Sequence, residues 1–111
     1  MNDPLPEIDA LTLAARLKNE RLALIDVREP EEHEDERIAG STLVPPASFD
    51  PRKVTDAHAG RTLVLYCMSG TRSARAAALF APAGLPTPLT LHEGIFGWKA
   101  AGLPTEGSGS D

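Results

Sequence analysis

Cysteine is almost absent from this sequence, and its scarcity excludes several kinds of site. The 111 residues include one cysteine, Cys67. It can form no internal disulfide, and one thiolate cannot make up a structural zinc site. The histidines His33, His58 and His92 lie in unrelated segments without the spacing of metal ligands, so we expect no metal site. His33 and His58 are expected at the surface. These exclusions leave the chemistry of a single thiol as the main question.

Basic residues are also scarce relative to acidic ones. Eleven Lys and Arg stand against sixteen Asp and Glu, giving a formal net charge of −5, whereas a nucleic-acid-binding domain needs a basic face. No apolar run approaches the roughly 18 residues of a membrane span. The first ten residues lack the basic region and apolar stretch of a signal peptide. We therefore expect a cytoplasmic protein that binds neither nucleic acid nor membrane.

Short apolar segments alternate with helical patterns along the chain. Strands are expected at residues 22–27, 41–44, 62–66 and 88–91. Helices are expected at 10–19, 30–37, 73–80 and 96–101, with an irregular one within 47–60. This alternation indicates a three-layer α/β domain, a parallel sheet of about five strands with helices on both faces. The domain is expected to span 1–104, and the Gly/Ser-rich tail 105–111 is expected to be disordered.

Cys67 directly follows the clearest strand, at the edge where open α/β sheets bind ligands. The loop from there into an Ala-rich helix consists of Met68, Ser69, Gly70, Thr71, Arg72 and Ser73. Small residues allow the loop to curl so that successive amides face one centre. The helix start and the charge of Arg72 add positive potential. These features favour a thiolate at Cys67 and a bound anionic substrate.

The spacing within this loop limits the size of the group that the loop can enclose. Four residues separate Cys67 from Arg72, and a loop that closes on a tetrahedral phosphate generally has one more. The shorter loop suits a smaller centre such as a single transferable sulfur atom. A lone cysteine at a strand end is otherwise often a small buried hydrophobe, but core packing does not require the glycine, arginine and serine that follow Cys67.

Three motifs together resemble those of the rhodanese-like family. The first is DVREPEE at 26–32 with IAG at 38–40, which is similar to the family's D-V-R-x-x-x-E segment and H-I-P-G-A turn. The second is CMSGTRS at 67–73, which resembles the active-site loop and is the most specific. The third is LHEGIFGW at 91–98 with GLP at 102–104, which resembles the family's C-terminal pattern. They span about three-quarters of the chain.

The resemblance implies a sulfurtransferase, similar to thiosulfate:cyanide sulfurtransferases, that works through a persulfide on Cys67. Arg72 would share in catalysis, and the other loop residues would bind substrate. Asp26 would organise the floor of the site, and Arg28 would form internal ion pairs, with Glu32 as a candidate partner. The reactants would be a small sulfur donor, thiosulfate or a persulfide, and a thiol or cyanide acceptor, with a protein persulfide as a further candidate partner. No cofactor would be required.

Two other classes share this fold and remain open. A non-catalytic rhodanese-like binding module would usually lack the cysteine, and a cysteine phosphatase or arsenate reductase would have a longer loop.

Two residues depart from the family pattern, and each departure leads to an expectation. Met68 stands where many thiosulfate-using members have a basic residue, so we expect thiosulfate to be a poor donor. Glu93 stands where the first glycine of a pair is usual, so we expect an altered turn near the site.

Overall fold

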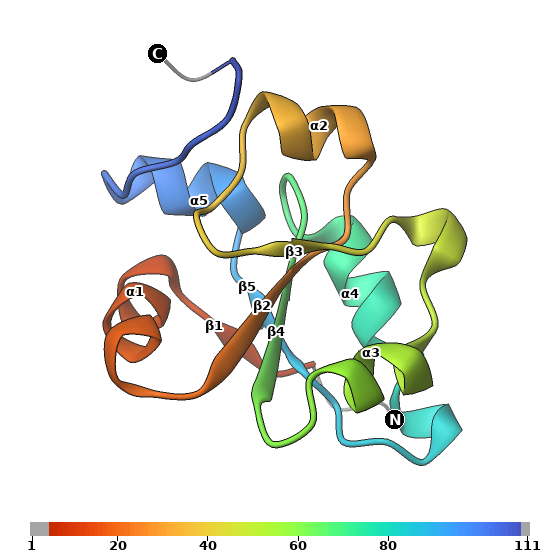
Figure 1. Ribbon diagram of the computed structural model, residues 1–111. Helices are drawn as coiled ribbons and strands as arrows, with labels where there is room; N and C mark the ends of the chain where they lie inside the picture. Colours follow the sequence, from red (N-terminus) through yellow and green to blue (C-terminus); the bar gives the residue numbers. More distant parts are fainter. Residues whose placement is uncertain (1–4, 110–111) are drawn as a thin grey trace.

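A five-stranded parallel sheet forms the centre of the computed structural model, which describes residues 5–109 (Figure 1). Its strands are β1 (Glu7–Ile8), β2 (Leu22–Asp26), β3 (Thr42–Leu43), β4 (Thr62–Tyr66) and β5 (Leu89–Leu91). Their order across the sheet is β1-β5-β4-β2-β3, and every pair is parallel. All four expected strands are present. The sequence did not identify β1, because two residues are too few to show a pattern.

Helices cover both faces of this sheet, which confirms the expected three-layer α/β fold. The helices are α1 (Ala10–Asn19), α2 (Pro30–Asp35), α3 (Pro51–Ala57), α4 (Thr71–Ala77) and α5 (Gly94–Ala100). Two short 3-10 turns are η1 (Pro46–Ser48) and η2 (Ala81–Ala83). Helices α1 and α5 pack on one face, α3 and α4 pack on the other, and α2 lies above the carboxyl ends of the strands (Figure 1).

Alternation along the two central strands divides the core between these faces. In β4, Val64 and Tyr66 pack towards α1 and α5, whereas Leu63, Leu65 and the following Cys67 pack towards α3 and α4. Both faces of the strand are buried, so its sequence is continuously apolar. This alternation places the Cys67 side chain on the α4 face.

Two helices begin earlier than expected, for a conformational reason. Gly70, with φ +118°, and Glu93, with φ +59°, directly precede α4 and α5. Each turns the chain sharply, so the helices start at Thr71 and Gly94 instead of near residues 73 and 96. Helix α1 begins as expected, because the Asp9 carboxylate accepts the Thr12 N–H at 2.8 Å.

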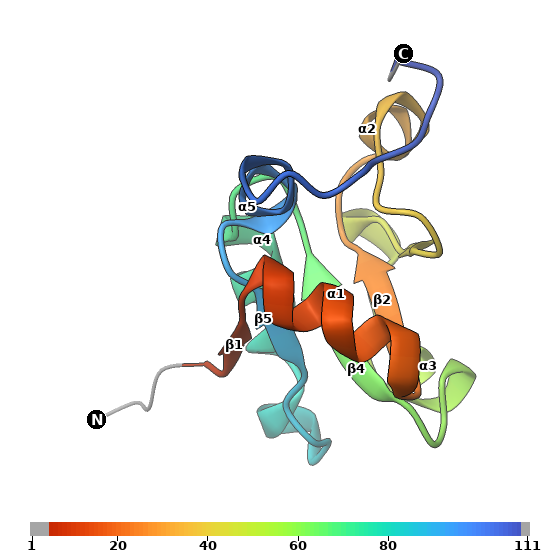
Figure 2. The ribbon, with the colours of Figure 1, turned by 90° about the vertical axis from the view of Figure 1, so that its left-hand side faces the viewer.

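The expected disorder of the C-terminal tail is corrected over residues 105–109. Arg37 and Glu106 exchange two backbone hydrogen bonds of 2.8 and 2.9 Å, and the N–H of Ser108 donates to the Glu34 carbonyl at 2.9 Å. The segment therefore lies along α2, as both ribbon views show (Figure 2). Residues 110–111 of the expected tail lie outside the described residues. Within residues 5–109, no helix has the length and hydropathy needed to cross a membrane.

Candidate active site

The loop that follows β4 rests on the beginning of α5. The N–H of Ile95 donates to the Cys67 carbonyl at 2.9 Å, and the N–H of Phe96 donates to the Met68 carbonyl at 3.2 Å. A β-carbon at Gly94 would collide with the Cys67 carbonyl oxygen. Glycine is therefore required where α5 meets the loop, and the segment carrying Cys67 is held against a rigid element.

The Cys67 sulfur lies close to two backbone N–H donors and to the Ser73 hydroxyl. The Gly70 N–H donates to Sγ at 3.0 Å and the Ser73 N–H donates at 3.4 Å, while the Ser73 hydroxyl lies 3.6 Å from Sγ. Cys67 itself is buried. The positive φ of Gly70, rarely adopted by other residues, turns its amide toward the sulfur. The structure thus brings Cys67, Gly70 and Ser73 together as the sequence predicts.

These donors determine the ionisation of the thiol. Burial of Cys67 by itself raises its pKa, since a charge is poorly solvated there. A hydrogen bond with the Ser73 hydroxyl, and those from the amides of Ser73, Gly70 and Arg72, outweigh burial and lower the pKa below its ordinary value. A lowered pKa increases the fraction of thiolate, the nucleophilic form of cysteine, near neutral pH.

The Arg72 side chain forms a two-pronged ion pair with Glu32 of α2. Its two terminal nitrogens lie 2.7 and 3.0 Å from the Glu32 carboxylate oxygens. Hydrogen bonding to Arg72 lowers the pKa of Glu32 to about 2. Because the pKa is lowered, the pair stabilises the fold above the ordinary glutamate range, and this contribution disappears as the pH falls toward 2. Part of the Arg72 charge is thus directed at Glu32, a partner that the sequence pattern does not reveal.

The buried Asp26 carboxylate connects the ends of β2 and β4 beneath α2. Arg28 donates to its two oxygens at 2.9 and 2.8 Å, the Tyr66 hydroxyl donates at 3.1 Å, and His33 Nδ1 lies 2.8 Å away. Burial raises the pKa of Asp26, but hydrogen bonds from Arg28 and His33 outweigh it and lower the pKa. Arg28 also donates to the Glu36 carbonyl at 2.6 Å. This network holds α2 above the carboxyl edge of the sheet.

Two expectations about α2 are corrected by this network. Arg28 pairs with Asp26, while the suggested partner Glu32 is bound to Arg72. His33 was expected at the surface, but its side chain is 18% exposed and contacts Asp26. The helix is polar throughout, so its sequence has no apolar stripe that would reveal its inner face. The four-residue spacing from Arg28 to Glu32 suggests an ion pair between them. Tertiary contacts instead determine the partners of both residues.

The remaining sequence candidates occupy different environments. Met68 is half-buried against the α1 and α5 side, whereas Ser69 and Thr71 are exposed at the loop surface. Trp98 is buried and its indole N–H donates to the Pro104 carbonyl at 2.8 Å, which anchors the end of α5. His92 is 55% exposed, between Glu7 and Glu93.

Glu93, which stands where the family usually has glycine, adopts a left-handed backbone conformation, one that glycine adopts readily. Its φ is +59° and its ψ is +14°, and it is the one non-glycine with positive φ within residues 5–109. Its carboxylate lies 3.3 Å from His92 Nε2, with both side chains more than half exposed. A contact of this kind adds little stability, so the strain of Glu93 is poorly offset.

Replacement of Glu93 with glycine should raise the free energy of unfolding. Relief of the left-handed strain stabilises the folded chain, whereas the extra conformational entropy of glycine stabilises the unfolded chain. The first effect is larger by about 0.5–1 kcal/mol. Urea unfolding of Glu93→Gly and Glu93→Ala measures this effect, because alanine removes the same carboxylate but keeps the strain. Equal stability of the two variants would contradict the explanation.

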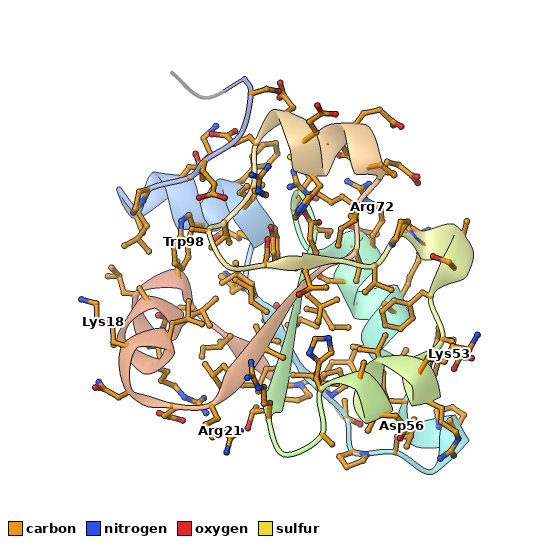
Figure 3. The ribbon with its side chains drawn as sticks, viewed as in Figure 1. Lys18, Arg21, Lys53, Asp56, Arg72 and Trp98 are labelled. Atoms are coloured by element: carbon orange, nitrogen blue, oxygen red, sulfur yellow. The ribbon has the colours of Figure 1, made fainter. Side chains whose placement is uncertain are left out.

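A cavity of about 420 Å³ adjoins the loop at Arg72, on the side of α4 and η1. Another, of about 580 Å³, lies at the opposite edge, near His58 and the amino end of β4. Figure 3 shows Arg72 projecting between α2 and the η1 segment. Among the described residues, no group of three or more His, Cys, Asp or Glu side chains could hold a metal ion.

Comparison with known proteins places these observations in a family. Residues 9–101 match the Rhodanese-like domain family. The chain is 35% identical over 99 residues to a sulfurtransferase of Allochromatium vinosum, covering 88% of this chain and 92% of that protein. It is 37% identical over 94 residues to an uncharacterized Synechocystis protein, covering 85% of this chain but spanning only 52% of that protein's length.

A solved structure shows the same fold. The rhodanese-like domain of an Anabaena protein, determined by NMR in solution, superimposes with a TM-score of 0.82 at 28% identity, covering 94% of this chain and 80% of that one. The match covers nearly the whole fold, so it confirms the family resemblance that the three sequence motifs indicate. This chain belongs to the family of rhodanese-like domains.

Proposed function

We propose that this protein is a sulfurtransferase that carries sulfur as a persulfide on Cys67. The observation that carries the proposal is the buried Cys67 sulfur, which faces the amides of Gly70 and Ser73 at 3.0 and 3.4 Å. Membership in the rhodanese-like family and the relative named sulfurtransferase support the general activity. No step of the proposed mechanism requires a metal or organic cofactor.

The reaction proceeds in two substitutions at sulfur. The Cys67 thiolate attacks the outer sulfur of thiosulfate or a persulfide, and the donor's S–S bond breaks with its electron pair on the leaving sulfite or thiolate. Cyanide or a thiolate then attacks the outer sulfur of the Cys67 persulfide and regenerates the thiolate. A protein persulfide could serve as donor by the same chemistry.

The loop residues have distinct roles in this proposal. The amides of Gly70 and Ser73 stabilise the negative charge on the sulfur, as donors in an oxyanion hole do. Arg72 contributes charge and, through Glu32, ties the loop to α2. Ser69 and Thr71 are exposed at the loop surface, where a substrate can contact them, and Met68 flanks the loop on the α1 and α5 side. Asp26 and Arg28 are positioning residues that support the sheet edge.

Two-step chemistry predicts ping-pong kinetics. Initial rates measured with varied thiosulfate at several fixed cyanide concentrations should give parallel double-reciprocal lines, because the donor's remnant leaves before the acceptor binds. Intersecting lines would instead indicate a complex of both substrates and would contradict a free persulfide intermediate. Hydrolysis of a phosphate ester, or reduction of arsenate to arsenite with an added thiol as reductant, in place of sulfur transfer would favour the alternative enzyme classes.

Replacement of Met68 with arginine should lower the KM for thiosulfate with a smaller change in kcat. Thiosulfate is a dianion, the Arg72 charge is already paired with Glu32, and Met68 offers its sulfonate no charge. A cation at position 68 would add binding that is similar in the ground and transition states, which changes KM more than kcat. Steady-state kinetics of both proteins, with Met68→Gln as an uncharged control, tests this. An equally low KM in all three would contradict it.

A further inference from the structure

Polar contacts hold helix α2 over the active site. Among its residues 30–35, all of which the structure describes, none is buried, so the helix has no apolar face that could fix its position on the sheet. Two neighbouring residues of α2 reach toward the sheet edge. Glu32 binds Arg72 at the catalytic loop, and His33 contacts the buried carboxylate of Asp26. The placement of α2 therefore depends on hydrogen bonds and ion pairs.

His33 links α2 to this buried carboxylate. Its Nδ1 lies 2.8 Å from Asp26 Oδ2, and because a carboxylate only accepts hydrogen bonds, Nδ1 carries the proton. Arg28 and Tyr66 donate to the same carboxylate from the ends of β2 and β4. Asp26 thus keeps these donors when the imidazole is removed. The bond from His33 serves to place α2 and is not needed to satisfy Asp26.

The Glu32 carboxylate moves with the first turn of α2. Its Oε1 accepts the Glu29 N–H at 3.0 Å, in a capping box at the start of the helix. The same carboxylate faces the guanidinium of Arg72 at 2.7 and 3.0 Å. A shift of α2 by about 1 Å away from the sheet would lengthen both contacts beyond hydrogen-bonding range. The position of α2 therefore determines whether the two-pronged pair forms.

We propose that His33 is a positioning residue for the active-site arginine. Its hydrogen bond to Asp26 holds α2 in place, and this keeps Glu32 on Arg72. The pair restrains the Arg72 guanidinium and takes up part of its charge, so His33 affects the reactivity of Cys67 by way of Arg72. The inference rests on the proposed function, in which Cys67 is the nucleophile.

Two substitutions of His33 separate its hydrogen bond from its ring and its charge. His33→Asn keeps a side-chain N–H near the place of Nδ1, whereas His33→Phe keeps a ring but has no donor. Both lack the imidazole, so a difference between them reports the hydrogen bond. NMR titration of the carboxyl carbon measures the pKa of Glu32, which Arg72 lowers to about 2. This pKa should be about one unit higher in His33→Phe than in His33→Asn, because the opposite charge lies further away.

Alkylation of Cys67 as a function of pH measures the thiol pKa in the same variants. When Arg72 is released from Glu32, more of its charge is available to the thiolate. The pKa of Cys67 should therefore be about half a unit lower in His33→Phe than in His33→Asn, the effect of one partly exposed ion pair. In a Glu32→Gln background, the two His33 variants should give the same value, because the pair is already broken.

His58 provides the matched control. It is half-buried at the opposite edge of the sheet, near the amino end of β4. His58→Phe and His58→Asn make the same chemical changes there, so they should give equal pKa values for Glu32 and equal pKa values for Cys67. If His33→Phe does not fold, His33→Leu, which also lacks a donor, takes its place in the comparison.

The outcomes separate this inference from the function on which it rests. Both expected shifts, lost at Cys67 in the Glu32→Gln background, support the role of His33. Equal titration of Glu32 or of Cys67 in His33→Phe and His33→Asn overturns it, as does a difference at Cys67 that persists without the Glu32 carboxylate. Neither titration uses a sulfur donor. If Cys67 accepts sulfur from no donor, the proposed function fails, and these titrations still decide whether His33 positions Arg72.

Discussion

Replacement of Cys67 with serine is expected to abolish sulfur transfer while the domain remains folded. The change is nearly isosteric at a buried position, and the serine hydroxyl can still accept hydrogen bonds from the amides of Gly70 and Ser73. Its pKa is far higher than that of a thiol, so it supplies no comparable nucleophile and forms no persulfide. Initial rates with thiosulfate and cyanide, and with an organic persulfide donor, measure the loss.

The control for this variant is its stability, since the chain has no second cysteine to substitute. Urea unfolding of Cys67→Ser should remain cooperative with a slope close to that of the natural protein, which indicates an intact fold. Retention of about a tenth of the activity by a folded Cys67→Ser protein would exclude Cys67 as the nucleophile.

Replacement of Arg72 with alanine is expected to raise the pKa of Cys67 and to slow persulfide formation by roughly 100-fold, as removal of a single well-placed donor can. The thiolate loses a nearby positive charge, and the Glu32 carboxylate, now unpaired, adds a negative one. The dependence of Cys67 alkylation on pH measures the pKa directly, because this is the only thiol in the chain.

Two companion variants separate local charge from net charge. Glu32→Gln leaves Arg72 unpaired beside the loop, so it should not raise the pKa of Cys67. Lys53→Ala removes one exposed cation from α3, distant from Arg72 in Figure 3, and should leave the pKa unchanged. An unchanged pKa in Arg72→Ala would mean that the backbone amides and Ser73 alone stabilise the thiolate.

Local sequence patterns predict much of this fold and the centre of its site. The apolar run at 62–66 and the CMSGTRS segment after it place a cysteine at the carboxyl end of a buried strand. Small residues in the loop predict converging amides, and the structure has Gly70 and Ser73 directed at the sulfur. These features depend on neighbours in the chain, so a pattern can reveal them.

Long-range pairings are the part that the sequence does not reveal. Arg72 and Glu32 are 40 positions apart, and the α2 region between Glu34 and Arg37 is bound by a tail that composition alone describes as flexible. In a helix as acidic as α2, several carboxylates have similar local surroundings. Only the packing of α2 over the sheet edge determines which of them meets Arg72.

Intact-mass measurement of the protein before and after exposure to a sulfur donor tests the central claim most directly. The natural protein should gain one sulfur atom from thiosulfate at high concentration or from an organic persulfide, and cyanide should then remove it. Cys67→Ser should gain none. If the natural protein gains no sulfur from any donor, or if Cys67→Ser gains as much as the natural protein, the persulfide mechanism is contradicted.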